Sequence, residues 1–182
     1  MRVIVMGVSG CGKTTVGPLL ADRIAGTFLD GDDLHPQSNV AKMTAGIPLT
    51  DADREPWLHE VGARLAAAPG TLILGCSALR RMYRDTIRAV APDTLFVHLH
   101  GSSQLLAARM SSRTSHFMPT ALLDSQLTTL EHLETDECGT VLDVAQSPAD
   151  LATAAAEWIL DTSGKQIRAM DGTRTLGRPS QT

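Results

Sequence analysis

Gly7-Val8-Ser9-Gly10-Cys11-Gly12-Lys13-Thr14 is the segment from which the fold class of this chain can be predicted. It has the spacing Gly-x-x-x-x-Gly-Lys-[Ser/Thr], and it stands between an apolar run at Val3–Val5 and a helical pattern from Val16 to Ile24. A strand, a glycine-rich turn and a helix in this order are the context that a phosphate-binding loop requires. Glycines allow the backbone to curl so that successive N–H groups face phosphate oxygens, and the helix adds its unpaired N-terminal donors. The stretch therefore predicts binding of a nucleoside triphosphate.

Side chains of the loop add to this prediction. Lys13 is placed to reach the β- and γ-phosphates, and the Thr14 hydroxyl is placed to ligate Mg²⁺. The alternative is a glycine-rich turn with a chance lysine, which the full spacing and the flanking elements disfavour. The residues expected to bind the nucleotide here are Gly7, Ser9, Gly10, Cys11, Gly12, Lys13, Thr14 and Thr15.

Composition narrows the class of protein. The 182 residues fit one domain, and 43% apolar with 20% charged residues is ordinary for a globular protein. A net charge of −4 argues against a nucleic-acid or membrane-surface binder, which needs a basic face. The three cysteines, Cys11, Cys76 and Cys138, are far apart in sequence and are expected to be free thiols. Cys11 is interpreted as a small side chain that fills a tight turn, with a redox-sensitive thiol as the alternative. Without a signal-peptide pattern or a long apolar run, a cytoplasmic location is expected.

Apolar runs and helical patterns alternate along the chain. Strands are expected near residues 3–5, 26–29, 71–75, 94–99 and 140–144, with helices between them and a last helix from about 147 to 160. This alternation predicts an α/β fold with a parallel sheet and helices on both faces. Residues 1–161 are read as one kinase domain of the P-loop NTPase fold, and residues 162–182, rich in small polar residues, as a disordered tail.

Two classes of P-loop protein compete, nucleotide switches and small-molecule kinases. A switch would carry Asn-Lys-x-Asp late in the chain, and this sequence has none. Arg109 and Arg113, four residues apart on an expected helix, precede a polar segment that suits a lid at about 109–126. Such a pair can clamp the nucleotide and neutralise charge on the moving phosphoryl group, which favours a kinase.

Three further groups of residues carry a family resemblance. The first is Leu29-Asp30-Gly31-Asp32-Asp33-Leu34-His35-Pro36, with Asn39, Lys42-Met43, the run 46–51, Asp53-Arg54 and Pro56-Trp57-Leu58. The second is Cys76-Ser77-Ala78-Leu79-Arg80 with Tyr83-Arg84-Asp85, and the third is His116-Phe117-Met118 with Leu122-Leu123 and Ser125-Gln126. In this order and spacing the chain resembles the gluconokinase family. The resemblance implies phosphorylation of D-gluconate by ATP with Mg²⁺, a sheet of strand order 2-3-1-4-5 as in shikimate and nucleoside-monophosphate kinases, and a homodimer.

The resemblance also implies roles at the site. Asp32 would orient and deprotonate the attacking hydroxyl, and Asp30, two residues away on an extended segment, would hold Mg²⁺ through water, alongside Thr14. Lys13, Asp32 and Arg113 form the expected catalytic set, and Gln146, in the segment 146–148, is expected near adenine with Arg109 and Arg113 on the nucleotide. The substrate-binding region is expected at about residues 30–68, with further contacts later in the chain. The residues expected to bind the substrate are Asp32, His35, Lys42, Arg54, Arg80, Arg84, His116 and Gln126. Either Arg80 or Arg84 could pair with the carboxylate, as could Arg54.

Alternatives stay open at this stage. A kinase for another small hydroxyl acceptor, such as a shikimate-like acid, has the same phosphate loop. A nucleotide-dependent binding protein with little turnover would also have it. His98 and His100 alternate on a strand and could mimic a metal pair, but no third ligand is evident.

Overall fold

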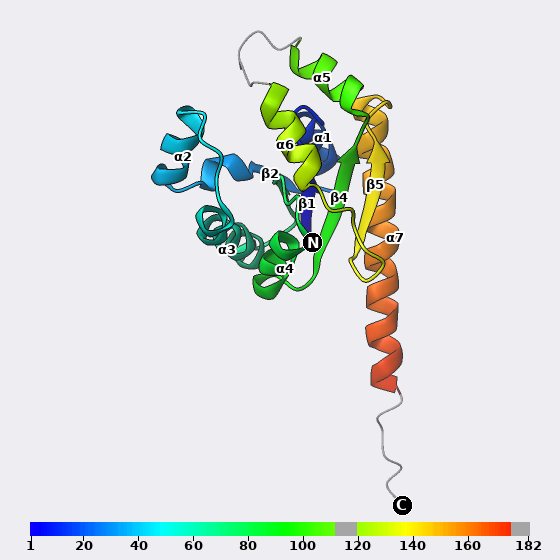
Figure 1. Cartoon of the computed structure of the whole chain (residues 1–182). Helices are drawn as coiled ribbons and strands as arrows, with labels where there is room; N and C mark the ends of the chain where they lie inside the picture. Colours follow the sequence, from blue (N-terminus) through cyan, green and yellow to red (C-terminus); the bar gives the residue numbers. More distant parts are fainter. Residues whose placement is uncertain (112–119, 176–182) are drawn as a thin grey trace, which may run out of the picture.

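A five-stranded parallel sheet forms the centre of the molecule (Figure 1). The computed structural model describes residues 1–111 and 120–175 of the chain. The strands are β1 Arg2–Met6, β2 Thr27–Asp30, β3 Leu72–Gly75, β4 Thr94–His100 and β5 Gly139–Asp143. Their order is β2-β3-β1-β4-β5, and each neighbouring pair is parallel. The fold class and the strand order expected from the sequence are confirmed.

Helices cover both faces of this sheet. In chain order they are α1 Lys13–Arg23, the 3-10 helix η1 Gly31–Leu34, α2 Gln37–Thr44, α3 Asp51–Ala67, α4 Arg81–Val90, α5 Ser103–Ser111, α6 Thr120–Thr129 and α7 Pro148–Thr175. On β1 the side chains of Val3 and Val5 pack with α1 and α7, whereas Ile4 and Met6 pack with α3 and α4. All four side chains are fully buried, which explains why β1 is apolar without alternation.

The carboxyl ends of the strands all meet at one edge of the sheet, because the strands are parallel. The phosphate loop follows β1, η1 follows β2, and the segment 76–80 follows β3. The segments after β4 and β5 lead into α5 and α7 at the same edge. In open α/β sheets this edge is where ligands bind, so the topology brings the candidate residues together.

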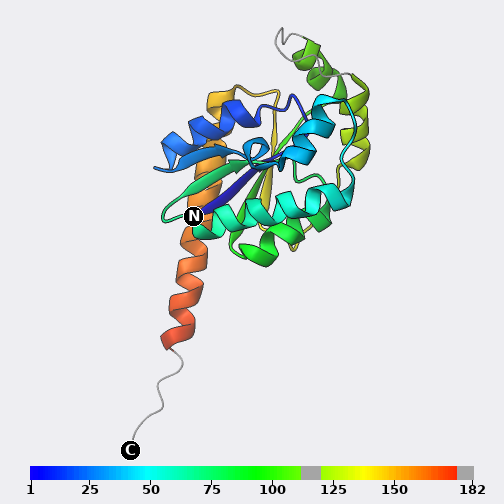
Figure 2. The same cartoon turned by 90° about the vertical axis from the view of Figure 1, so that its left-hand side faces the viewer.

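The last helix is longer than the sequence analysis predicted. The expected end near Leu160 and the disordered tail are wrong for residues 162–175, because α7 continues to Thr175 and extends past the sheet in both views (Figures 1 and 2). No proline interrupts this part of the chain, and Lys165 pairs with Asp161 one turn earlier at 2.7 Å. Although α7 has 28 residues, neither it nor any other described helix is apolar and long enough to cross a membrane.

Candidate functional site

The phosphate loop has the backbone conformation that its glycines predict. Gly10 and Gly12 have φ values of +81° and +103°, in the left-handed region that favours glycine, and Gly12 is the N-cap of α1. A Cβ atom at Gly10 would lie 2.8 Å from Cγ of Met110, so the loop packs closely against α5. Any larger residue at Gly10 would therefore be opposed both by its backbone conformation and by the neighbouring helix.

Lys13 lies folded across the loop that it follows. Its ammonium group donates hydrogen bonds to the carbonyl oxygens of Gly7 at 2.9 Å and Val8 at 3.3 Å. The hydroxyl of Thr14 is exposed and has no partner among the described residues. A cation and a free hydroxyl thus stand at the start of α1, where an anion is also favoured by the helix N-terminus.

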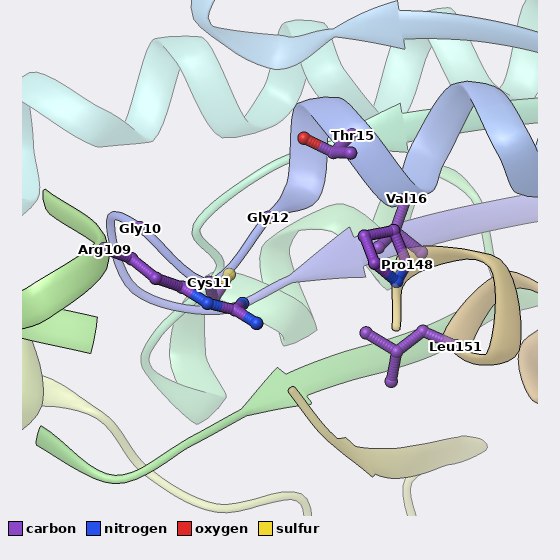
Figure 3. A pocket seen from close by; sticks show the side chains of 8 residues that line it. All are labelled: Gly10, Cys11, Gly12, Thr15, Val16, Arg109, Pro148 and Leu151. Carbon is purple, nitrogen blue, oxygen red and sulfur yellow. The ribbon is translucent and has the colours of Figure 1, made fainter. Parts of the chain in front are cut away.

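A cavity of about 320 Å³ opens beside the loop (Figure 3). Its lining residues come from the phosphate loop, the first turn of α1, α5 and the start of α7: Gly10, Cys11, Gly12, Thr15, Val16, Arg109, Pro148 and Leu151. The sequence analysis named the loop residues and Arg109. It missed Val16 and Leu151, whose apolar side chains carry no motif signal, while Gln146 is exposed and lies outside this wall. Cys11 is fully buried, as expected for a side chain that fills the turn.

Arg109 is held in the wall of this cavity. Its Nη2 atom donates to the carbonyl oxygen of Val144 at 2.6 Å, which links α5 to the segment after β5. Figure 3 shows the guanidinium group close to the phosphate loop. Two further predicted residues, Arg113 and His116, lie outside the described residues.

Gln126 contacts the phosphate loop from the other side. Its Oε1 atom accepts a hydrogen bond from the backbone N–H of Ser9 at 2.6 Å, across 117 residues of sequence. Helix α6, which carries Gln126, therefore packs over the beginning of the loop. The structure places this predicted substrate residue beside the phosphate end of the site.

Asp30 and Asp32 are not on one extended segment, which corrects the spacing argument made from the sequence. Asp30 ends β2, and Asp32 lies in η1, where its backbone N–H donates to Oδ1 of Asp30 at 3.1 Å. The turn forms because Gly31 packs against β3, where a Cβ atom would lie 2.4 Å from the carbonyl oxygen of Gly75. Burial raises the pKa of Asp30, and Asp32 is exposed. Lys13 lies close enough to favour the charged form of Asp30, so this carboxyl stands near the start of α1.

The next wall of the site is built on α3. The indole Nε1 of Trp57 donates to the carbonyl oxygen of Gly31 at 2.7 Å, which fixes η1 against this helix. The imidazole of His35 stacks on the Trp57 ring with 4.1 Å between centroids. One turn earlier on α3, Arg54 extends toward Tyr83 of α4. Asp32, His35 and Arg54 are thus brought together by Trp57.

The basic side chains of this region differ in whether a carboxylate already pairs with them. Lys42 binds Asp53 at 2.7 Å, and that contact, with hydrogen bonds from Thr50, lowers the pKa of Asp53 to about 2. Arg80 binds Asp51 at 2.7 Å. Arg54, in contrast, makes no ion pair with any described residue; it donates to the Leu49 carbonyl oxygen at 2.5 Å and lies 3.5 Å from the Tyr83 hydroxyl.

Arg84 requires a correction. The sequence analysis proposed it as a carboxylate-binding residue, but its side chain is fully buried and forms a two-pronged ion pair with Glu137, at 2.6 and 2.7 Å. It also donates to carbonyl oxygens of Ala78 and Leu79. Arg84 therefore holds the segment after β3 and is closed to a substrate. Its partner stands 53 residues away, which no local pattern could reveal.

His98 and His100 meet a third histidine, His132, with ring centroids 5.6 to 6.3 Å apart. Even so, no three metal-ligating side chains of the described residues are arranged to hold a metal ion. The metal pair considered from the sequence therefore gains no support.

Comparisons with known proteins agree with this geometry. A family model described as shikimate kinase matches residues 9–168. Thermosensitive gluconokinase of Escherichia coli K12 is 40% identical over 173 residues, which cover 93% of this chain and 92% of the relative. Gluconokinase of Gluconobacter oxydans is 49% identical over 138 residues, 74% of this chain and 78% of the relative. The crystal structure of a gluconokinase from Sinorhizobium meliloti superposes with a TM-score of 0.85 at 44% identity, over 92% of this chain and 96% of that one.

Proposed function

This chain belongs to the gluconokinase family, and we propose that it transfers the terminal phosphoryl group of ATP to the O6 hydroxyl of D-gluconate. The products are ADP, 6-phosphogluconate and a proton. The observation that supports the acceptor is the state of Arg54, a partly buried cation that has no carboxylate partner among the described residues. Its charge lies close enough to His35, which directly follows the acidic turn η1, to lower the pKa of that imidazole. A sugar acid supplies the missing carboxylate and, at its other end, an alcohol.

The acidic turn presents that alcohol to the phosphoryl group. Asp32 is exposed at the carboxyl edge of the sheet, so its carboxylate can accept a hydrogen bond from the O6 hydroxyl and take its proton during transfer. Lys13 leaves the carbonyl oxygens of Gly7 and Val8 and donates instead to the phosphates. Phosphoryl transfer requires little covalent chemistry from the protein. Positioning of the alcohol by Asp32 and the positive charge of Lys13 therefore supply most of the rate enhancement.

The residues present also fit a magnesium ion bound together with ATP. The free hydroxyl of Thr14 and the carboxylate of Asp30 offer the oxygen ligands that Mg²⁺ prefers, with phosphates and water completing its shell. When bound, the ion neutralises charge on the phosphates. The absence of a three-ligand group among the described residues is compatible with this, since Mg²⁺ at kinase sites uses one or two carboxylates.

Arg54 is the proposed carboxylate ligand, and Arg80 is the second cation of the same wall. Arg54 lies 5.7 Å and Arg80 5.9 Å from the centre of the Tyr83 ring, so both guanidinium groups rest on one aromatic side chain. Arg80 is already neutralised by Asp51. A ligand carboxylate therefore gains more at Arg54, which has a full charge to offer.

A panel of acceptors tests the proposal. ADP release is measured with D-gluconate, with D-glucitol, which has the same chain but no carboxylate, and with shikimate. We expect kcat/KM for gluconate to exceed that for glucitol by at least ~100-fold, because a charge-assisted pair is lost. Equal rates with gluconate and glucitol would refute the role of Arg54 in recognition. A preference for shikimate would favour the alternative acceptor, and nucleotide binding without turnover would indicate a binding protein.

A further inference from the structure

A buried asparagine lies next to His35 and is bound on both sides. Asn39, on α2, is 2% exposed and is one of few buried polar side chains among the described residues. Its Nδ2 atom lies 2.7 Å from the backbone carbonyl oxygen of Asp53 and 3.3 Å from Nδ1 of His35. The asparagine therefore ties α2 to the N-terminal turn of α3 and contacts the imidazole that stacks on Trp57.

These two contacts determine which nitrogen of His35 carries the hydrogen. A backbone carbonyl oxygen only accepts hydrogen bonds, so the amide group of Asn39 must direct its nitrogen toward Asp53. The second hydrogen on that nitrogen is then directed at Nδ1 of His35, which must act as an acceptor. In a neutral imidazole the other nitrogen, Nε2, is then the donor.

The surroundings also keep this imidazole neutral. Burial and the positive charge of Arg54 lower the pKa of His35 to about 4. The stacked Trp57 is uncharged, α2 presents the uncharged amide of Asn39, and the acidic side chains of η1, Asp32 and Asp33, are exposed. At neutral pH the ring is therefore an uncharged donor.

The Nε2–H group of His35 has no partner among the described residues. Within the part of the chain that the structure describes, the only hydrogen bond of its ring is the one to Asn39, and the side chain is partly exposed rather than buried. It stands in the wall that Trp57 shares with Arg54 and with the turn of Asp32. A directed donor that the protein leaves unused at this place is available to a ligand oxygen.

We infer that Asn39 is a positioning residue that holds His35 as the Nε2–H tautomer, and that this N–H group donates to an oxygen of the sugar acid. The inference rests on the proposed acceptor and goes beyond it by assigning a tautomer, a donor atom and a second residue that sets them. Neither Asn39 nor His35 takes part in proton transfer. Their contribution is to acceptor binding and its selectivity.

The tautomer is measured directly by two-bond proton–nitrogen correlation spectra of the ¹⁵N-labelled protein at pH 7. The His35 signals are assigned by their loss in His35→Phe, and His59→Gln, at an exposed position of α3, serves as the control that retains them. We expect a protonated Nε2 and a bare Nδ1 in the wild type, and a mixture of tautomers in Asn39→Ala. A protonated Nδ1 or an imidazolium in the wild type would overturn the inference.

The kinetic test uses Asn39→Asp, because a carboxylate accepts a hydrogen bond where the amide donates one. Aspartate would favour hydrogen on Nδ1 and raise the pKa of His35. At pH 8 we expect the KM for gluconate to rise at least ~10-fold, with kcat within about threefold and the KM for ATP unchanged. As the pH is lowered the imidazolium regains an Nε2–H donor, so the KM should fall toward that of the wild type, whose own KM stays flat from pH 8 to 6.

This recovery at low pH is the readout that a merely structural role of Asn39 would not produce. In a His35→Phe background, Asn39→Asp should cause no further pH-dependent change. A loss of gluconate affinity that is the same at all pH values, or no loss at pH 8, would overturn the inference. If instead the wild type shows no preference for gluconate over glucitol while the tautomer is as expected, the proposed acceptor fails and the assignment of Asn39 stands.

Discussion

The guanidinium group of Arg54 lies 5.7 Å from the centre of the Tyr83 ring, with Nη1 3.5 Å from the phenolic oxygen. Tyr83 in turn donates its hydroxyl hydrogen to Asp51, which also binds Arg80. The phenol therefore separates two cations, of which one is neutralised and the other is not. This asymmetry distinguishes the arginines that the sequence left equivalent.

Replacing Arg54 with methionine should remove most of the selectivity for an acid. Methionine keeps much of the apolar stem but not the charge, so we expect the KM for gluconate to rise about 100-fold, with the KM for ATP unchanged. The rate with glucitol should change by less than about threefold. Arg64→Met, at an exposed i,i+4 pair on the same helix, is the matched control and should leave both constants near wild type. If the KM for gluconate stays normal in Arg54→Met, another residue binds the carboxylate, and Arg80 is the next candidate.

Asp32→Asn should impair the transfer step and leave nucleotide binding nearly intact. An amide can still accept a hydrogen bond from the alcohol but cannot take its proton, so kcat should fall by at least ~100-fold. Single-turnover kinetics and ATP titration separate the two effects. Asp33→Asn, the exposed neighbour in η1, is the control. Near-normal turnover of Asp32→Asn would exclude Asp32 as the catalytic base.

Breaking the buried pair of Arg84 and Glu137 should destabilise the fold. Both side chains are inaccessible to solvent, so Arg84→Met leaves a buried carboxylate without its main partner. The expected loss in the free energy of unfolding is about 3–5 kcal/mol, measured in urea. The double variant Arg84→Met, Glu137→Leu should lose less than the sum of the single changes. Removing the surface pair Arg64–Glu60 should cost less than about 1 kcal/mol, and an equally small loss at Arg84 would contradict the structural role.

The buried imidazole of His98 should make the folded protein less stable at acid pH. Burial, the neighbouring His100 and His132, and then Arg84 lower its pKa to about 4 from 6.5, and its buried Nδ1 atom has no hydrogen-bond partner in the described ranges 1–111 and 120–175. Between these values the unfolded chain binds a proton that the folded one does not, so the free energy of unfolding falls as the pH drops through this window. From pH 7 to 5 the contribution of His98 is about 2 kcal/mol.

The measurement is urea unfolding at pH 7 and pH 5. His98→Leu removes the titrating group, so its stability should change less with pH than that of the wild type. His59→Leu, at an exposed histidine, should keep the wild-type dependence. The same pH dependence in His98→Leu and wild type would show that His98 is not the group responsible.

The phosphate loop, the alternation of strands and helices and the family of the chain could all be predicted from the order of residues. These features depend on short stretches of sequence. Gly10 and Gly12 allow the turn of the phosphate loop, and the continuous apolar run of β1 indicates a strand that is buried on both faces of the sheet. The sequence also predicted that Asp32, His35 and Arg54 belong to one substrate-binding region, because they are close in sequence.

Which basic groups are available to a ligand, and in what protonation state, depends on contacts between elements that are far apart in sequence. Arg84 is paired with Glu137, whereas Arg54 has no carboxylate partner among the described residues, and both outcomes depend on residues from other elements. The bend between Asp30 and Asp32 follows from the packing of Gly31 against β3, and the hydrogen on His35 follows from Asn39 and the Asp53 carbonyl. Motifs specify which side chains are present, whereas the charge and the hydrogen bonds that a side chain can still offer a ligand depend on the partners that folding brings to it.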